Sequence, residues 1–200
     1  VASGGTLTVV LTDKAANDST ASAGVNLVVD YVVPTVSISS SSTSLIAGQT
    51  ATLTFTLSEA AASSGAGAFT SADVNAASGA LSAWTAVSST VYTAVFTPSS
   101  GTAGATSAIS IAAGALTDAT GNPNTVSNTV NVAVDTVAPA VVKFESSTAN
   151  GSYREGSTIA ITATMSEQVR AGATITVVLD STSVPVVLTT AIADTVLSGT

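Results

Sequence analysis

Apolar and polar positions alternate along much of the chain with a period of two. Apolar residues alternate with threonines in 50–57 and with asparagine and alanine in 128–134. This alternation is typical of strands with one buried face, and helical spacing is not sustained over any useful length. The chain is therefore predicted to be all-β. The strands expected in its central part are 35–40, 50–57, 72–77, 80–87, 91–97, 106–112 and 128–134.

One block of sequence occurs twice in the chain. Residues 11–17 (LTDKAAN) resemble 116–122 (LTDATGN), and 25–30 (VNLVVD) resemble 130–135 (VNVAVD), both at an offset of 105 positions. This period is too long for a solenoid unit and is typical of a string of sandwich domains.

Two proline-containing segments, 30–34 and 135–139, mark the expected domain boundaries. Proline lacks an N–H group and holds the preceding residue in an extended conformation, so short and fairly rigid linkers are expected. Residues 1–33 would be the last two strands of one domain, 34–138 a complete domain, and 139–200 the first part of a further domain.

Four motifs carry a family resemblance. The segments AGQTATLTFTLSE (47–59), VYTAVFTP (91–98), LTDATGN (116–122) and DTVAP (135–139) are similar to the Ig-like repeats of giant bacterial surface adhesins and related extracellular repeat proteins. The resemblance covers essentially the whole chain, with 139–200 looking like a sister subtype. It implies tandem immunoglobulin-like β-sandwich domains, about seven strands each, in a linear array. It also implies an extracellular stalk or filament on the bacterial surface that spaces or links rather than catalyses.

Composition and charge narrow the possible functions. The net charge is −8 and the four basic residues are scattered singly, which argues against nucleic acid, because its binding needs clustered Lys and Arg. Cysteine and histidine are absent, so thiol catalysis, Ser-His-Asp catalysis and the usual zinc, copper and iron–sulfur ligands are excluded. No apolar run approaches the ~20 residues of a membrane span. We expect no enzymatic activity.

Strand direction predicts a calcium site at one end of the complete domain. Strands that run back toward the first linker end in loops there, which gathers Glu59, Asp118 and Asn122 near Asp30 in the linker. Carboxylates about 4 Å apart repel by roughly 1 kcal/mol per pair in water, and Ca²⁺ relieves this by taking six to eight oxygen ligands. The competing interpretation is that these side chains only form Asx turns and solvated linker charges.

The repeat extends the same prediction to the flanking parts. Asp13 and Asn17 would serve the first domain, and Asp135 and Glu167 the third. All of these are expected as structural Ca²⁺ ligands.

The partner of the chain is left open between two interpretations. The sequence is either an excerpt of a longer tandem array, or a subunit whose residues 1–33 complete the third domain of a neighbour by strand addition. Neighbouring copies or domains of the same protein, head to tail, are the partners in either case.

The alternative function is an adhesive module for a glycan or host-surface receptor. Trp84 and Tyr92 would then be a stacking platform, against a competing role in half-buried packing.

Overall fold

The computed structural model describes residues 3–178 and 185–200 and divides into two compact units, Val1–Val137 and Ala138–Thr200. Strands provide nearly all of its regular structure, which confirms the prediction of an all-β chain. Among the described residues, helical backbone is confined to two short 3₁₀ turns, Gly65–Gly67 and Ser71–Asp73.

The first unit begins with a β-hairpin. Its antiparallel strands β1 (Ser3–Leu7) and β2 (Val25–Val29) pair from Ser3 opposite Val29 to Leu7 opposite Val25. The polar face is held across the strands by a hydrogen bond from Thr6 Oγ1 to Asn26 Oδ1 at 2.9 Å.

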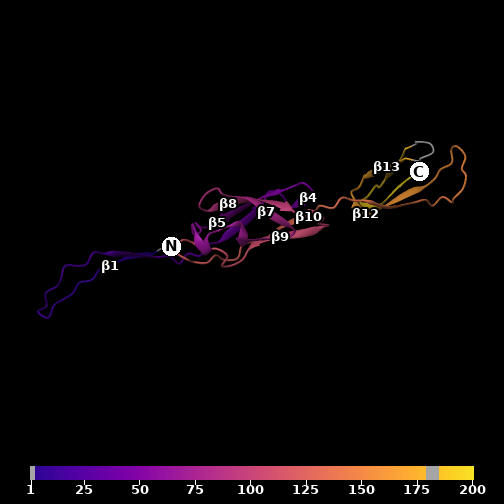
Figure 1. Cartoon of the computed structure of the whole chain (residues 1–200). Coiled ribbons are helices and arrows are strands. Elements are labelled where there is room, and N and C mark those ends of the chain that lie inside the picture. Colours follow the sequence, from indigo (N-terminus) through magenta and orange to yellow (C-terminus); the bar gives the residue numbers. More distant parts are fainter. Residues whose placement is uncertain (1–2, 179–184) are drawn as a thin grey trace. The chain divides into compact units, whose positions relative to one another are not determined.

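A β-sandwich follows in the same unit (Figure 1). The strands of its first sheet are, in spatial order, β3 (Val36–Ser40), β5 (Ala51–Leu57), β8 (Val91–Pro98) and β7 (Gly79–Ala86). Those of its second sheet are β4 (Ser44–Ile46), β10 (Val130–Asp135), β9 (Ala105–Ile111) and β6 (Val74–Ala76). Seven of these strands lie within two residues of the predicted positions. The additional strand β4 pairs in parallel with β10.

The core of the sandwich follows from the alternation along its strands. In β5, Leu53 and Phe55 are fully buried, whereas Thr52 and Thr56 face away from the core. The threonines are β-branched and favour the extended backbone of a strand. Because side chains alternate between the two faces of a strand, the apolar residues of β5 all point to the core and the threonines point away from it. The same rule buries Ile109, Ile111, Val132 and Val134 on the second sheet.

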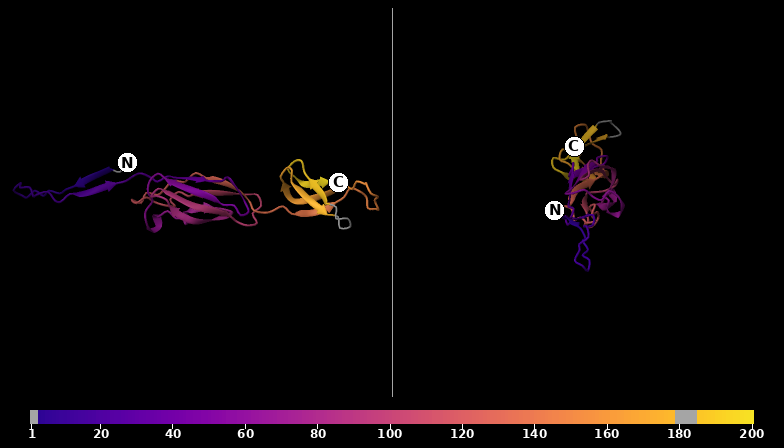
Figure 2. Two further views of the ribbon diagram at one scale, coloured as in Figure 1. Left: turned by 90° about the horizontal axis from the view of Figure 1, so that it is seen from above. Right: turned by 90° about the vertical axis from the view of Figure 1, so that its left-hand side faces the viewer.

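The second unit contains a single five-stranded sheet among its described residues, drawn in orange and yellow in Figure 2. Its strands are, in spatial order, β11 (Val141–Glu145), β12 (Ile161–Val169), β15 (Asp194–Gly199), β14 (Pro185–Thr189) and β13 (Thr174–Val178). Its core consists of five buried apolar residues: Ala163, Met165, Val169, Leu188 and Leu197.

Candidate metal centre

Three carboxylates from three separate segments meet at one end of the sandwich. Asp30 follows β2, Glu59 follows β5, and Asp118 lies in the loop after β9. One carboxylate oxygen of each residue lies within 4.8 Å of those of the other two. Because β5 and β9 both run toward this end, their trailing loops converge there, as strand direction predicts.

The loop after β9 fixes the position of Asp118. Its Oδ1 accepts hydrogen bonds from the backbone N–H groups of Thr120, at 2.8 Å, and Asn122, at 2.9 Å. Its Oδ2 accepts one from Nδ2 of Asn122 at 2.8 Å. Burial raises the pKa of Asp118, but the hydrogen bonds from Asn122 and Thr120 outweigh burial and bring the pKa to about 2. Asp118 is therefore a carboxylate held in place by its own loop and ionised at neutral pH.

Asn122 ties this loop to the linker that follows the hairpin. Its Nδ2 also donates to the backbone oxygen of Asp30 at 3.2 Å. The Asp30 carboxylate is in turn held by its own chain, because Oδ1 accepts from Val32 N at 3.0 Å. In this conformation Asn122 positions the two aspartates.

Glu59 is the least satisfied member of the cluster. Its Oε1 is shielded from solvent and has no hydrogen-bond partner. Burial, followed by the charges of Asp118 and Asp30, raises the pKa of Glu59. A buried acceptor without a donor is rare in folded proteins, and here a proton or a cation would satisfy it.

The donor set favours a hard cation. All three side chains offer carboxylate oxygens, which Ca²⁺ and Mg²⁺ prefer, and the spacing leaves room between them for an ion. Among the described residues, no other three acidic side chains come as close together.

The remaining four predicted ligands lie elsewhere. At the hairpin tip, Asp13 Oδ2 accepts from Nδ2 of Asn17 at 3.0 Å, and this hydrogen bond is the main cause of a lowered pKa of Asp13. Asp135 ends β10, and its Oδ1 accepts from Val137 N at 3.2 Å. Glu167 lies on β12 in the second unit, and its Oε1 is buried without a partner, like that of Glu59.

A family model described as bacterial Ig-like domain matches residues 30–134. The matched segment spans both sheets of the sandwich and all three carboxylates of the cluster. The chain belongs to the bacterial Ig-like domain family. No curated protein and no solved structure matches the chain. Ig-like domains of this kind are structural modules. Within the described residues, no helix has the length and apolar character needed to cross a membrane.

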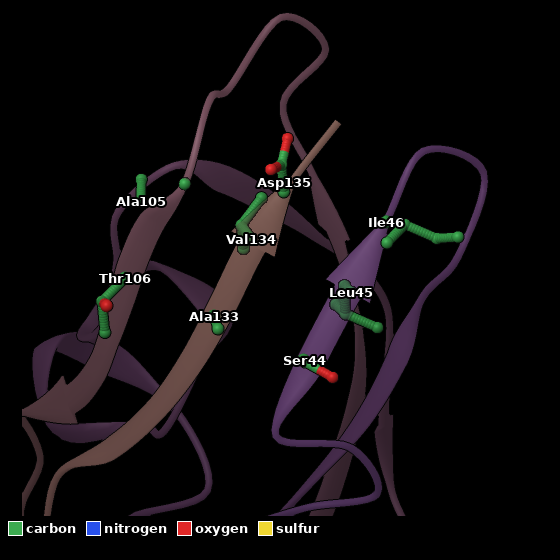
Figure 3. A pocket seen from close by; sticks show the side chains of 9 residues that line it. Ser44, Leu45, Ile46, Ala105, Thr106, Ala133, Val134 and Asp135 are labelled. Carbon is green, nitrogen blue, oxygen red and sulfur yellow. The ribbon is translucent and has the colours of Figure 1, made fainter. Parts of the chain in front are cut away.

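A hollow lies at the other end of the Ig-like domain, between β4, β9 and β10 (Figure 3). Asp135 is its one charged lining residue, Ser44 and Thr106 add one hydroxyl group each, and the rest of the lining is glycine or apolar: Leu45, Ile46, Gly104, Ala105, Ala133 and Val134. Ligand sites need several convergent polar groups to orient a ligand. This hollow offers one carboxylate, which its own backbone already engages.

Four aromatic residues of the Ig-like domain, Phe55, Phe69, Trp84 and Tyr92, form one cluster. Trp84 lies 4.9 Å from Phe69 and 5.3 Å from Phe55 between ring centroids, and Tyr92 lies 5.0 Å from Phe69. The contacts of Phe69 with Trp84 and with Tyr92 are edge-to-face, a geometry that stabilises cores. Trp84 and Tyr92 are half-buried and pack against the core. The ring surface that a stacked sugar would need is therefore partly covered.

Sequence reasoning missed Asn124, a buried residue that holds the loop after β9 in place. Its Oδ1 accepts from Leu116 N at 2.9 Å, and its Nδ2 donates to the backbone oxygens of Ala112, at 2.9 Å, and Thr125, at 2.7 Å. The one signal in the sequence is that its counterpart 105 positions earlier, Ser19, also carries a hydrogen-bonding side chain.

Proposed function

We propose that the chain is a structural spacer of an extracellular bacterial surface protein, forming part of the stalk of an adhesin or of a filament. One observation carries the proposal: the chain enters the Ig-like domain at one end and leaves it at the other. Asp30 lies beside the loop that follows β9, whereas Asp135 ends β10, whose Val134 pairs with Ala105 at the start of β9. Seven residues of β9 at about 3.3 Å each separate these ends by roughly 20 Å.

Opposite attachment points suit a spacer because each added domain lengthens the chain of domains instead of folding back on it. The family and the low charge content of 8% support the same role. A surface rich in Ser, Thr and Asn remains soluble while offering few charged groups for substrate chemistry.

The proposal includes Ca²⁺ at the junction between hairpin and sandwich. Asp30 belongs to the linker, whereas Glu59 and Asp118 belong to the sandwich. A cation bound to all three would cross-link the linker to two loops, and the buried, unpartnered Oε1 of Glu59 supports its presence. Bending at the junction would then require breaking metal–oxygen contacts.

Surface display tests the spacer role. One, two or three tandem copies of the chain are placed between a bacterial membrane anchor and an epitope tag, and the distance from tag to membrane is measured by immunogold electron microscopy. The distance should grow with each copy. A distance independent of copy number would overturn the proposal.

A further inference from the structure

The strand by which the chain enters the Ig-like domain and the strand by which it leaves run in the same direction. β3 is antiparallel to β5, β10 is antiparallel to β9, and both β5 and β9 run toward the Asp30 end. β3 and β10 therefore both start at the Asp30 end and run toward the Asp135 end. Tension between the two linkers pulls the start of β3 and the end of β10 in opposite directions, so it shears one strand past the other.

Hydrogen bonds join these two parts of the chain at three places along the domain. At the Asp30 end, Thr125 N donates to the backbone oxygen of Pro34 at 3.0 Å. Toward the other end, Ala133 N donates to the backbone oxygen of Thr43 at 2.9 Å, and β4, which follows β3, pairs in parallel with β10. The third connection lies between these two and is made by the side chain of Asn128.

Asn128 binds both backbone groups of one residue on β3. Its Oδ1 accepts from Ile38 N at 2.7 Å, and its Nδ2 donates to the backbone oxygen of Ile38 at 3.0 Å. β3 is the edge strand of its sheet, and an edge strand presents N–H and C=O groups that no neighbouring strand pairs. The amide of Asn128, two residues before β10 begins at Val130, takes the place of such a neighbour. It thereby connects the edge strand of one sheet to the segment that leads into the other sheet.

We propose that the Ig-like domain bears tension between its two linkers, and that the side chain of Asn128 resists the shearing of β3 against β10. β3 and β10 belong to different sheets, and among the described residues no strand pairing joins them directly. The two bonds of Asn128 therefore hold the middle of β3. Shear loads these bonds together with those at the two ends of the domain, so no single bond carries the whole force.

Load bearing deepens the proposed spacer role and rests on it for its use at the cell surface. The two proposals can nevertheless fail separately. A domain that unfolds easily still lengthens a stalk under no load, so the surface-display distance does not report the strength of the domain. The unfolding force, in turn, does not depend on where the chain is displayed or on bound Ca²⁺ if it is measured with chelator present.

Force can be applied to the Ig-like domain alone within the full chain. The chain has no cysteine, so Val33→Cys and Val137→Cys, which are 43% and 40% exposed in the natural chain, attach two DNA handles specifically. Optical tweezers then pull the two linkers apart and leave the hairpin and the second unit outside the path of the force. Asn128→Ala is compared with the unsubstituted chain in this background, and because Asn128 is exposed the variant should fold, which circular dichroism verifies.

Asn124→Ala is the matched control. The side chain of Asn124 makes three hydrogen bonds, to Leu116, Ala112 and Thr125, and all of them lie within 112–125. None of these bonds joins β3 to β10, so tension between the linkers does not pull them apart first. The control variant should lose at least as much stability in urea as Asn128→Ala, without the same loss of resistance to force.

Unfolding under constant force distinguishes the two variants. Asn128→Ala should unfold roughly tenfold or more faster than the unsubstituted chain, because two hydrogen bonds that must break under shear are missing. Asn124→Ala should unfold under the same force at nearly the unsubstituted rate. Equal acceleration in both variants, or no acceleration in Asn128→Ala, would overturn the inference.

The direction of pulling gives a second readout. Val33→Cys combined with Val126→Cys, which is 67% exposed in the natural chain, places both handles at the Asp30 end. Force applied there peels the two parts of the chain from each other, and the bonds at Pro34, Ile38 and Thr43 break in succession. The domain should open at a clearly lower force than when the linkers are pulled apart. The same force in both directions would contradict a shear-resisting role.

Discussion

A carboxylate oxygen of Glu59 lies within 4.8 Å of one of Asp118, and the pKa values of the two groups shift in opposite directions. Hydrogen bonds from Asn122 and Thr120 outweigh burial and keep the pKa of Asp118 at about 2, so this carboxylate is charged at neutral pH. Glu59 has no such donors and must lose its proton beside that charge. The junction is therefore under electrostatic strain at neutral pH unless a cation is present.

Added Ca²⁺ is expected to stabilise the chain. At a concentration 100 times the Kd, binding to the folded state alone would contribute about 2.7 kcal/mol, and about 1 kcal/mol raises the Tm of a domain of this size by roughly 4–8 °C. Differential scanning calorimetry of chelator-treated chain measures the shift. Glu59→Gln should reduce it strongly, whereas Glu155→Gln, an exposed site in the second unit, should leave it unchanged. Equal shifts in both variants would place the cation elsewhere.

Without Ca²⁺, the chain should become more stable as the pH falls from neutrality toward 4.5. The pKa of Glu59 is raised by burial and by Asp118 and Asp30, so the folded chain takes up a proton at a higher pH than the unfolded chain, whose value is near 4.5. The free energy of unfolding then increases as pH falls through this window. Glu59→Gln should remove the increase, as measured by urea unfolding.

Below pH 3.8 the free energy of unfolding should instead decrease as the pH falls. The pKa of Asp118 is lowered from 3.8 to about 2, so the stability it contributes is lost as pH falls from 3.8 through 2. These two groups together place the optimum of the chelator-treated chain near pH 4. A chain whose stability rises steadily from pH 4 to neutrality would contradict this account.

Much of the sandwich could be predicted because its strands obey a period of two. Leu53, Phe55 and Leu57 mark β5 without reference to any other strand. Strand β4 could not be predicted, since Leu45 is its one buried residue and a single residue has no period. The sequence also could not predict the sheet position of β13. In the sandwich β6 pairs with β9, whereas β13 pairs with β14 on the edge of the other sheet, so its partner decides its position.

The candidate site was predictable to the extent that topology determines it. Strand direction alone brings Glu59 and Asp118 to the same end as Asp30. What strand direction cannot reveal is which atoms are already occupied. The amide nitrogen of Asn122 donates to Asp118 and Asp30, while Oε1 of Glu59 has no partner. Both facts depend on side-chain rotamers and loop conformation.

Replacement of Asn124 should destabilise the sandwich. Asn124→Ala leaves one backbone N–H and two backbone oxygens without their partner, at about 1–3 kcal/mol for each buried group that water does not reach. Asn124→Ser should be milder, because Ser19 at the equivalent hairpin position accepts from Leu11 N at 3.0 Å. Chemical unfolding compares the two variants. A serine variant as unstable as the alanine variant would argue against this role.

Trp84→Ala distinguishes a packing role of Trp84 from a role in sugar binding. Loss of the indole from its contacts with Phe55, Phe69 and Tyr92 should lower the free energy of unfolding by roughly 2–4 kcal/mol. On a glycan array the natural chain and the variant should give the same background signal. A glycan signal that the variant abolishes would instead support an adhesive module.

If a cation stiffens the junction of this spacer, the distance between a spin label on the hairpin and one on the sandwich should vary less with Ca²⁺ than without it. The chain has no cysteine, so single cysteines introduced at the exposed Thr8 and Thr56 label the hairpin and the sandwich specifically. Electron–electron double resonance should show a narrow distance distribution with Ca²⁺ and a broad one with chelator, and Glu59→Gln should remain broad in both. Distributions of equal width with and without Ca²⁺ in the unsubstituted junction would contradict the account.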